Sequence, residues 1–135
     1  LSSSNLMLCI IDLDDFRKLT KLYGYKMGDK ILNIVSQKIL RVISIEQTDK
    51  LSFELYKLES DKFVLLVLPK NSLIEKDIND ITSNLINKLE EDSFEIDENV
   101  SLDISFTLGL AYNEEDDILN IYNSNSLTNS NPFSK

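Results

Sequence analysis

The sequence contains no histidine and no tryptophan among its 135 residues. The lack of histidine excludes histidine acid–base catalysis, the Ser-His-Asp and Cys-His nucleophile arrangements, and metal sites built on imidazole ligands. Cys9 is the only cysteine, so no disulfide can form within the chain, as expected for a reducing compartment. Any chemistry must therefore use carboxylates, lysines, hydroxyl groups or the backbone.

Basic residues and long apolar runs are also scarce. The 14 basic and 23 acidic residues give a formal net charge of −9, which disfavours binding to nucleic acid or to an anionic membrane surface. No apolar run approaches the roughly 20 residues that a membrane-spanning helix needs. Residues 1–5 lack the positive charge typical of a signal peptide. We therefore expect a cytoplasmic domain that contacts neither nucleic acid nor membrane.

The spacing of apolar residues predicts an alternation of strands and helices. Runs and period-two patterns predict strands at residues 6–11, 51–55, 63–68 and 102–110. Helical spacing predicts helices over residues 16–23, from Gly28 to about 43, and from the Ser72–Glu75 capping box to 89. This order predicts an α+β fold with a ferredoxin-like β-α-β-β-α-β core, in which helices flank a mainly antiparallel sheet.

The length and composition predict one domain over residues 1–135. A hydrophobic content of 42% is enough for a single compact core, which we place within residues 6–112. Residues 113–135 are acidic and then rich in Asn and Ser, so this segment is expected to be weakly structured.

Acidic residues cluster at two predicted strand ends. Asp12, Asp14 and Asp15 follow the first strand, and Asp61 lies at the predicted hairpin tip. If the first strand pairs beside the hairpin, Asp12 and Asp61 converge, and two carboxylates there could hold Mg²⁺ and align a nucleoside triphosphate. Alternatively, these acids cap the following helix and keep a turn polar. Spacing alone leaves both interpretations open.

Three segments resemble the GGDEF (diguanylate cyclase) family. Residues 12–32 follow the family pattern D-x-D-x-F-K … N-D-x-x-G-H-x-x-G-D-x-x-L without a gap. Residues 57–63 fall at the position of R-x-G-G-D-E-F, on the same hairpin. Residues 105–111 are similar to the S-x-G-x-A strand. The resemblance covers residues 6 to about 111 and implies the same fold that the periodicity predicts.

The resemblance assigns roles to several conserved residue types. Asp12 and Asp61 match the metal-binding carboxylates, and the carbonyl group of Leu13 matches a backbone metal ligand. Asp29 matches an aspartate that hydrogen-bonds guanine. These positions imply that Mg²⁺ would accompany any bound nucleotide.

Other positions depart from the family pattern, so the resemblance is to a degenerate member. Lys62 replaces the catalytic glutamate and places a cation where an anionic ligand belongs. Glu59 and Ser60 replace two glycines whose backbone approaches the phosphates. Thr20 replaces the asparagine that reads guanine, and Tyr25 replaces a histidine. We expect no intact catalytic site.

Three classes of function follow. The first is a catalytically inactive regulatory, dimerisation or nucleotide-sensing module in a cyclic di-GMP signalling protein. Its partners would be a neighbouring EAL phosphodiesterase or sensor domain, a second copy, or weakly bound GTP. The second is a weak diguanylate cyclase, or another GTP-using nucleotidyl transferase or hydrolase, with a rebuilt metal site. The third is an unrelated ferredoxin-like interaction domain. Lys18, Lys21 and Lys26 are interpreted as a solvated helix face and not as a phosphate site.

Overall fold

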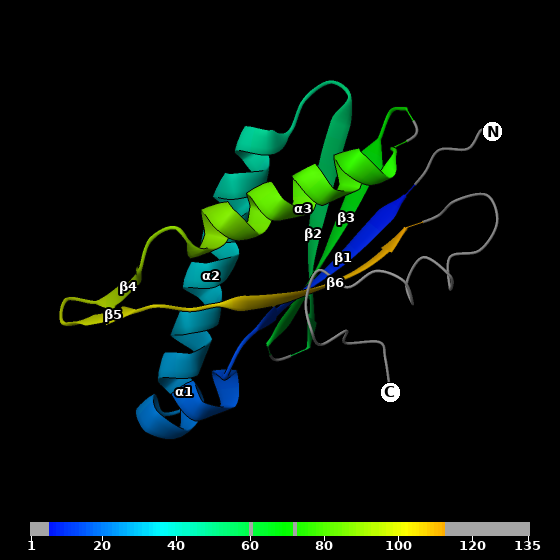
Figure 1. Cartoon of the computed structure of the whole chain (residues 1–135). Helices are drawn as coiled ribbons and strands as arrows, with labels where there is room; N and C mark the ends of the chain where they lie inside the picture. Colours follow the sequence, from blue (N-terminus) through cyan, green and yellow to red (C-terminus); the bar gives the residue numbers. More distant parts are fainter. Residues whose placement is uncertain (1–5, 60, 72, 113–135) are drawn as a thin grey trace.

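The computed structural model describes residues 6–59, 61–71 and 73–112 (Figure 1). Its strands are β1 (Met7–Leu13), β2 (Leu51–Glu59), β3 (Lys62–Pro69), β4 (Phe94–Asp97), β5 (Val100–Leu102) and β6 (Phe106–Tyr112). Its helices are α1 (Phe16–Tyr23), α2 (Tyr25–Glu46) and α3 (Glu75–Glu90). The helices and strands predicted from the sequence are therefore present, except that the strand predicted over residues 102–110 is divided, and the small β4–β5 hairpin was not predicted.

The main sheet has the strand order β2-β3-β1-β6, and every neighbouring pair is antiparallel. This is the ferredoxin-like arrangement expected from the element order. Residues 51–58 and 62–68 lie in adjacent strands, with Asp61 in the turn between them. The predicted α+β fold is confirmed, and β1 lies directly beside the β2–β3 hairpin.

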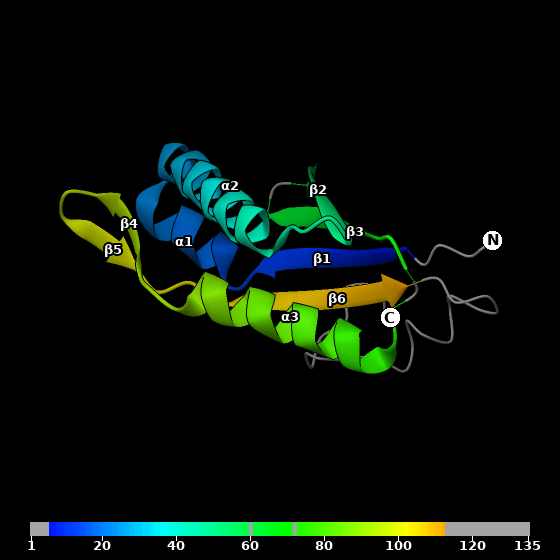
Figure 2. The ribbon, with the colours of Figure 1, turned by 90° about the horizontal axis from the view of Figure 1, so that it is seen from above.

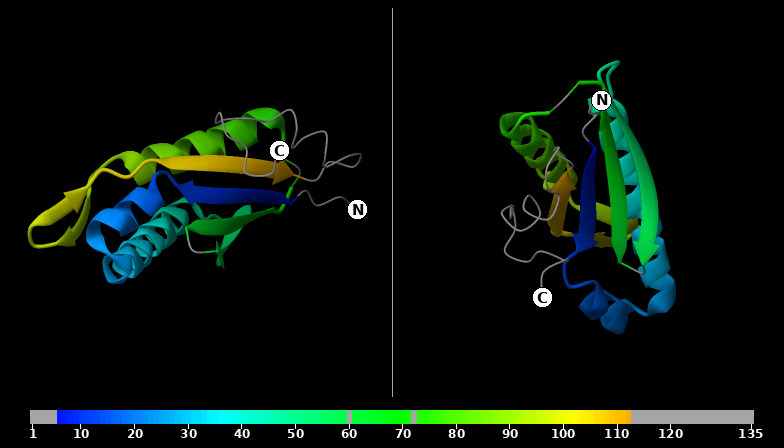
Figure 3. Two further views of the ribbon diagram at one scale, coloured as in Figure 1. Left: turned by 90° about the horizontal axis from the view of Figure 1, so that it is seen from below. Right: turned by 90° about the vertical axis from the view of Figure 1, so that its right-hand side faces the viewer.

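Helices α2 and α3 cover one face of the main sheet (Figures 2 and 3). On β3, the alternate residues Phe63, Leu65 and Val67 are buried and belong to one hydrophobic core with Ile31 and Val35 of α2. The period-two pattern of the strands and the helical pattern of α2 thus meet in a single apolar layer. Because apolar burial is the main force that favours folding, this layer fixes the position of the strand ends that carry the acidic residues.

Two glycines shape the junction between α1 and α2. Gly24 ends α1 with a φ of 91°, a conformation that favours glycine. Gly28 lies one turn into α2, which begins at Tyr25 and not near Gly28 as expected. A methyl group at Gly28 would lie 2.7 Å from Cγ2 of Thr20 and 3.3 Å from Cζ of Phe16. Gly28 therefore permits a close approach of the two helices, whereas the sequence pattern alone suggested a helix start.

The segment predicted as one strand over residues 102–110 is divided between two sheets. Val100–Leu102 pairs with Phe94–Asp97 as the β4–β5 hairpin, and β6 joins the main sheet only from Phe106. At the junction, the backbone N–H of Phe106 donates to Glu90 Oε2 at 2.8 Å. Alternation of apolar and polar residues indicates which side chains are buried, but it does not indicate which neighbouring strand each segment pairs with.

Two other expectations fall on segments outside the description. Ser72 of the expected capping box and residues 113–135 lie outside the described residues. Within the described part, α3 begins at Glu75, and the N–H of Ile74 donates to Asp77 Oδ2 at 3.2 Å. No helix among the described residues is long and apolar enough to cross a membrane.

Candidate functional site

The ends of β1 and of the β2–β3 hairpin bring two carboxylates and one ammonium group together. Asp12 pairs with Lys62 across the β1–β3 ladder, and the N–H of Leu13 donates to the carbonyl oxygen of Asp61 at 3.2 Å. Lys62 Nζ lies 3.7 Å from Asp12 Oδ2 and 3.4 Å from Asp61 Oδ1. The structure therefore places Asp12 and Asp61 at one edge of the sheet, as the sequence led us to expect, and places Lys62 between them.

Burial and neighbouring charges act in opposite directions on Asp12. Burial raises the pKa of the Asp12 carboxyl group above its ordinary value of 3.8 and is the largest effect. The Lys62 ammonium lowers this pKa, whereas the carboxylates of Asp61 and Asp14 raise it. The net result is a raised pKa, so one nearby cation does not fully offset the cost of placing the Asp12 charge at this partly buried strand end.

Asp14 does not join this cluster through its hydrogen bonds. Its carboxylate accepts from Ser105 Oγ at 2.8 Å and from Thr107 Oγ1 at 2.6 Å, and its N–H donates to the carbonyl oxygen of Ser105 at 3.0 Å. Asp14 thus ties the end of β1 to the start of β6. The following residue, Asp15, has a φ of 59° and begins the turn into α1. Asp14 therefore has a structural role, but the expected capping of the following helix is not seen, because Asp15 at the N-cap of α1 makes no side-chain hydrogen bond to the helix.

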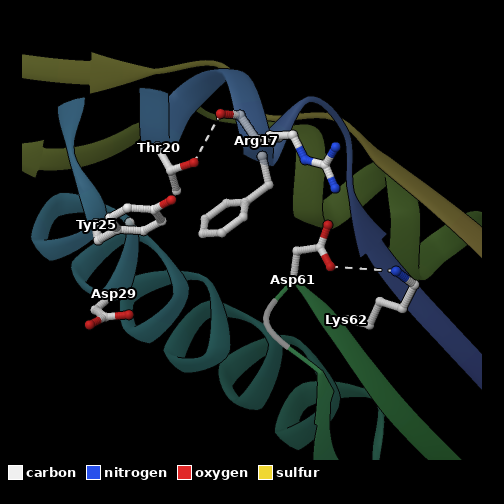
Figure 4. Close-up of a pocket in the computed structure, with 8 residues that line it drawn as sticks. Arg17, Thr20, Tyr25, Asp29, Asp61 and Lys62 are labelled. Carbon is white, nitrogen blue, oxygen red and sulfur yellow. Dashed lines mark hydrogen bonds and ion pairs between the residues drawn. The ribbon is translucent and has the colours of Figure 1, made fainter. Parts of the chain in front are cut away.

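A cleft of about 370 Å³ opens beside the Lys62 cluster, between α1, α2 and the hairpin turn (Figure 4). It is lined by Phe16, Arg17, Thr20, Tyr25, Gly28, Asp29, Asp61 and Lys62. Arg17, Asp61 and Lys62 lie at one end of the cleft, and Tyr25 and Asp29 lie at the other. The cleft thus has one end with both signs of charge and one end with a single carboxylate.

Thr20 and Asp29 both line the cleft, but Thr20 is turned toward its own helix. Thr20 Oγ1 donates to the carbonyl oxygen of Arg17 at 2.9 Å (Figure 4). The methyl group of Thr20 packs against Gly28. The hydroxyl group is therefore engaged with the backbone, and the methyl group fills the helix crossing. Asp29 remains exposed on α2 and is the acceptor that this end of the cleft offers.

The remaining predicted site residues are Leu13, Glu59 and Ser60. The amide group of Leu13 is bonded to the Asp61 carbonyl, and its side chain is buried in the core. Glu59 pairs with Lys62 at the end of the hairpin, after an irregularity in register that begins at Lys57. The side chain of Glu59 and all of Ser60 lie outside the described residues.

Arg17, Phe16 and Tyr25 line the cleft although the sequence did not identify them as cleft residues. The side chain of Tyr25, which stands where the family pattern has a histidine, is 82% exposed. Arg17 could have been identified from its position directly after Phe16, which is the buried residue of the first turn of α1.

Mg²⁺ is the ion that the family resemblance implies for this cluster. Such a site needs several oxygen ligands around the ion. In the described residues, no group of three or more Asp, Glu, Cys or His side chains could hold a metal ion. The Lys62 ammonium lies within 4 Å of both carboxylates that would serve as ligands. The described side chains therefore do not fit a divalent cation.

Comparison with known proteins identifies relatives of the chain. The family model "Diguanylate cyclase, GGDEF domain" matches residues 1–125. An uncharacterized membrane protein of Staphylococcus haemolyticus, SH2145, is 22% identical over 115 residues, which are 85% of this chain. The chain spans only 30% of the length of that relative.

Solved structures with the same fold are GGDEF domains. The GGDEF domain of YfiN (TpbB) from Pseudomonas aeruginosa matches with a TM-score of 0.70 and 20% identity, over 90% of this chain and 73% of that one. An EAL/GGDEF domain protein from M. capsulatus matches with a TM-score of 0.69 and 18% identity, over 92% and 74% of the two chains. The GGDEF domain of DgcB from Caulobacter crescentus, solved with c-di-GMP, matches with a TM-score of 0.67 and 13% identity, over 90% and 69%.

The family model covers more than half of the chain, and the solved GGDEF domains share its fold. The chain therefore belongs to the GGDEF domain family, the diguanylate cyclase family of cyclic di-GMP signalling.

Proposed function

We propose that this chain is a catalytically inactive GGDEF domain that acts as a regulatory module in a larger cyclic di-GMP signalling protein. The observation that carries the proposal is the position of Lys62. Its ammonium group lies 3.4 Å from one acid and 3.7 Å from the other that the family would use for metal. A cation at this distance repels Mg²⁺ and competes with it for the same carboxylate oxygens.

A second feature supports the loss of activity at the other end of the cleft. Thr20 stands where the family has a guanine-reading asparagine, and its hydroxyl group is bonded to the carbonyl oxygen of Arg17. A guanine base placed there would lack the paired amide contacts that an asparagine makes, which leaves polar groups of the base without a protein partner. Asp29 still offers a carboxylate that can accept from the base. Phosphoryl transfer depends on the positioning of the nucleotide and on neutralisation of its charge. The change at Thr20 affects the positioning, and the change at Lys62 affects the neutralisation by metal.

The regulatory role rests on the contrast between the core and the cleft. The apolar pattern of the sheet and of α2 forms one continuous core, whereas the charged positions of the cleft depart from the family. The curated relative is much longer than this chain, and a solved neighbour is an EAL/GGDEF domain protein. We therefore place this domain beside an EAL phosphodiesterase or sensor domain, in the cytoplasm, where it changes the activity or assembly of that neighbour.

A second candidate function is a weak nucleotidyl transferase or hydrolase with a rebuilt site. Arg17 and Lys62 line the same cleft and could both contact phosphate groups. In that mechanism, Lys62 would replace part of the charge that a metal ion normally supplies, and Asp12 would still be required.

An assay with GTP separates the two candidates. Purified protein at high concentration is incubated with GTP and either Mg²⁺ or Mn²⁺, and the products are identified by mass spectrometry. We expect no cyclic di-GMP and no other GTP-derived product above the level of Asp12→Ala. Loss of one well-placed charged group typically costs about 10²–10³ in rate, and here Lys62 replaces the catalytic glutamate and is only one of several departures from the family pattern. A product that disappears in Asp12→Ala would contradict the proposal and support the rebuilt site.

The regulatory half of the proposal needs the parent protein. Deletion of this domain should change the activity, the oligomeric state or the ligand response of the neighbouring domain. A nucleotide titration with and without Mg²⁺ then tests whether GTP is the signal. If deletion leaves all three properties of the neighbour unchanged, the regulatory role is wrong even if the domain lacks cyclase activity.

A further inference from the structure

Helix α1 and the start of α2 form a corner at one end of the molecule. In Figure 1, this corner lies at the lower end of α2, below the β4–β5 hairpin. Every residue from Lys21 to Lys26 is exposed. Leu22 is 75%, Tyr23 42% and Tyr25 82% exposed. Exposed apolar and aromatic side chains of this size, gathered in one short segment, indicate a surface that contacts something other than water.

Cations surround these apolar side chains. The segment of residues 16–28, called the basic corner below, contains no acid and carries Arg17, Lys18, Lys21 and Lys26. All four cations are exposed, and none of them forms a salt bridge with the described residues. The net charge of −9 for the whole chain therefore conceals a local surface of the opposite sign.

The order of residues along α1 places three of the cations and Leu22 on one face of the helix. With 3.6 residues per turn, positions 17, 18, 21 and 22 fall within less than half of the helix circumference. Phe16 is buried on the other side of α1, and Leu19 packs against the core. The inner face of α1 therefore holds the helix on the domain, and its outer face presents positive charge together with an apolar side chain.

This combination of side chains fits the surface of a bilayer that contains anionic lipid. Each lysine or arginine held close to anionic headgroups raises the affinity by about fivefold. Tyrosine favours the boundary between headgroups and acyl chains, and an exposed leucine gains by leaving water for the acyl region. A lipid surface adapts to a projecting corner, whereas an acidic protein would need a surface shaped to receive it. Charge and shape together therefore favour lipid.

The acidic remainder of the domain does not prevent this contact. Asp15 and Asp29 flank the basic corner, which keeps an excess of positive charge even when both are counted, with four cations against two acids. The exposed acids Glu95, Asp97 and Glu98 belong to the β4–β5 hairpin, which is set back from the corner (Figure 1). Because repulsion between exposed charges falls off within about 10 Å at 0.1 M salt, the charges nearest the lipid dominate. The net charge, which disfavoured a membrane contact, is an average over the whole surface.

We propose that the basic corner binds a membrane surface rich in anionic phospholipid, with Leu22 and Tyr25 inserted at the boundary between the headgroups and the acyl chains. The lysines of the corner contact the headgroup phosphates. Arg17 and Tyr25 also line the cleft, so a bound membrane lies at the mouth of the cleft and limits access to it. The contact uses neither Asp12 nor Lys62, so it stands or falls independently of the catalytic proposal.

A charge-reversal variant tests the contact on the whole 135-residue chain. The corner variant is K18E/K21E/K26E, which leaves the cleft residue Arg17 in place. A matched control, R41E/K50E/K70E, changes the net charge by the same amount at three exposed cations outside the corner that form no salt bridge with the described residues. Circular dichroism verifies that all three proteins are folded.

Cosedimentation measures the binding of each protein to vesicles of phosphatidylcholine alone and to vesicles with equal parts of phosphatidylcholine and phosphatidylserine. The wild type and the control should bind only the vesicles with phosphatidylserine, and more weakly as salt rises from about 50 to about 500 mM, because salt screens the attraction. The corner variant should bind these vesicles at least about 100-fold more weakly, since it loses three cations from the contact.

A fluorescent probe tests the insertion of Leu22. The chain contains no tryptophan, so a single introduced indole reports its own surroundings. In Leu22→Trp, the emission should shift to shorter wavelength when vesicles with phosphatidylserine are added, because the ring leaves water for the headgroup boundary. Ile45→Trp, in the last turn of α2 at a side chain that is 69% exposed, is the matched control and should show no shift.

Three results would overturn the proposal. The first is a wild type that does not cosediment with phosphatidylserine vesicles at low salt. The second is a charge control that binds as weakly as the corner variant, since the effect would then be one of net charge. The third is an emission of Leu22→Trp that stays unchanged on vesicles that bind the protein. Retention of the wild type on immobilised polyglutamate, lost in the corner variant while vesicles do not bind, would assign the corner to an acidic protein instead.

Discussion

Strand β1 shows two different kinds of constraint along its length. Met7, Cys9 and Ile11 point into the core and are at most 1% exposed. Asp12, one residue further, belongs to a cluster of charges at the edge of the sheet. The buried residues of β1 must stay apolar, because the fold depends on burying their surface. The residue at the end of the strand can change its chemistry without disturbing the fold. Substitutions in the core should therefore change the stability of the domain, whereas substitutions in the cleft should change its chemistry and leave the fold intact.

The largest effect on stability should come from the core. Leu65→Ala removes a fully buried side chain of β3 and should lower the free energy of unfolding by about 3 kcal/mol, because the cavity cannot close completely. Urea denaturation measures the change. The matched control is Leu58→Ala on β2, where the leucine is largely exposed and the change should stay within about 0.5 kcal/mol. Equal losses in the two variants would show that the core is not where the stability resides.

A smaller effect should come from the helix crossing that shapes the cleft. In Gly28→Ala, the added methyl group would lie 2.7 Å from Cγ2 of Thr20, so α1 must shift, at a cost of about 1–2 kcal/mol. Thr20→Ser removes that methyl group and keeps the hydroxyl. In the Thr20→Ser background, Gly28→Ala should cost clearly less, because only the 3.3 Å approach to Cζ of Phe16 remains and alanine favours helix more than glycine does.

The four proteins of this pair form a double-mutant cycle, which isolates the coupling between positions 20 and 28. A coupling near zero would mean that Thr20 does not pack on Gly28. It would then be free to turn its hydroxyl group toward a ligand in the cleft.

The next effect concerns the connection between β1 and β6. Asp14→Ala removes the acceptor for the hydroxyl groups of Ser105 and Thr107, which should lower the free energy of unfolding by about 1–2 kcal/mol. Asp29→Ala, at an exposed carboxylate of α2, serves as the control and should change stability by less than about 0.5 kcal/mol. If Asp14→Ala were as mild as Asp29→Ala, Asp14 would be available for a role in the cleft, contrary to our assignment.

The smallest effect should be the pH dependence that Asp12 contributes. Its pKa in the folded protein is raised above 3.8, so the folded state binds a proton more tightly than the unfolded state does. The contribution of Asp12 to stability is therefore greatest below pH 3.8 and is lost as the pH rises through the folded pKa. Relative to Asp12→Asn, the wild type should lose stability over this interval, as measured by urea denaturation at a series of pH values. A wild type that gains stability would mean that the attraction of Lys62 outweighs burial.

The sequence predicted the fold well because the fold depends on apolar spacing. The runs at residues 6–11 and 63–68 and the helical stripe of α2 each specify an element and its buried face, and these elements pack in one way. The prediction failed where the spacing of apolar residues does not indicate which strands pair with each other. Residues 102–110 alternate without a break, yet Leu102 and Phe106 belong to different sheets.

The sequence predicted which residues belong to the candidate site better than it predicted how their side chains are arranged. The convergence of Asp12 and Asp61 followed from the expected position of β1 beside the hairpin. The separation of Asp14 from that pair could not be predicted, because it depends on hydroxyl groups about 90 residues away in the chain. Likewise, the orientation of Thr20 is set by Gly28, a contact between two helices that one-dimensional patterns do not report.

The central claim is that Lys62 occupies the position of the metal ion, and a magnesium titration tests it most directly. Isothermal titration calorimetry compares the wild type, Lys62→Glu and the neutral control Lys62→Met with Mg²⁺ at millimolar concentrations and without nucleotide. The wild type should give no saturable heat, because its two acids already share an ammonium group. Lys62→Glu should bind Mg²⁺ saturably and melt at a higher temperature in its presence, with Lys62→Met in between. Saturable Mg²⁺ binding by the wild type, unchanged in Lys62→Glu, would contradict the account.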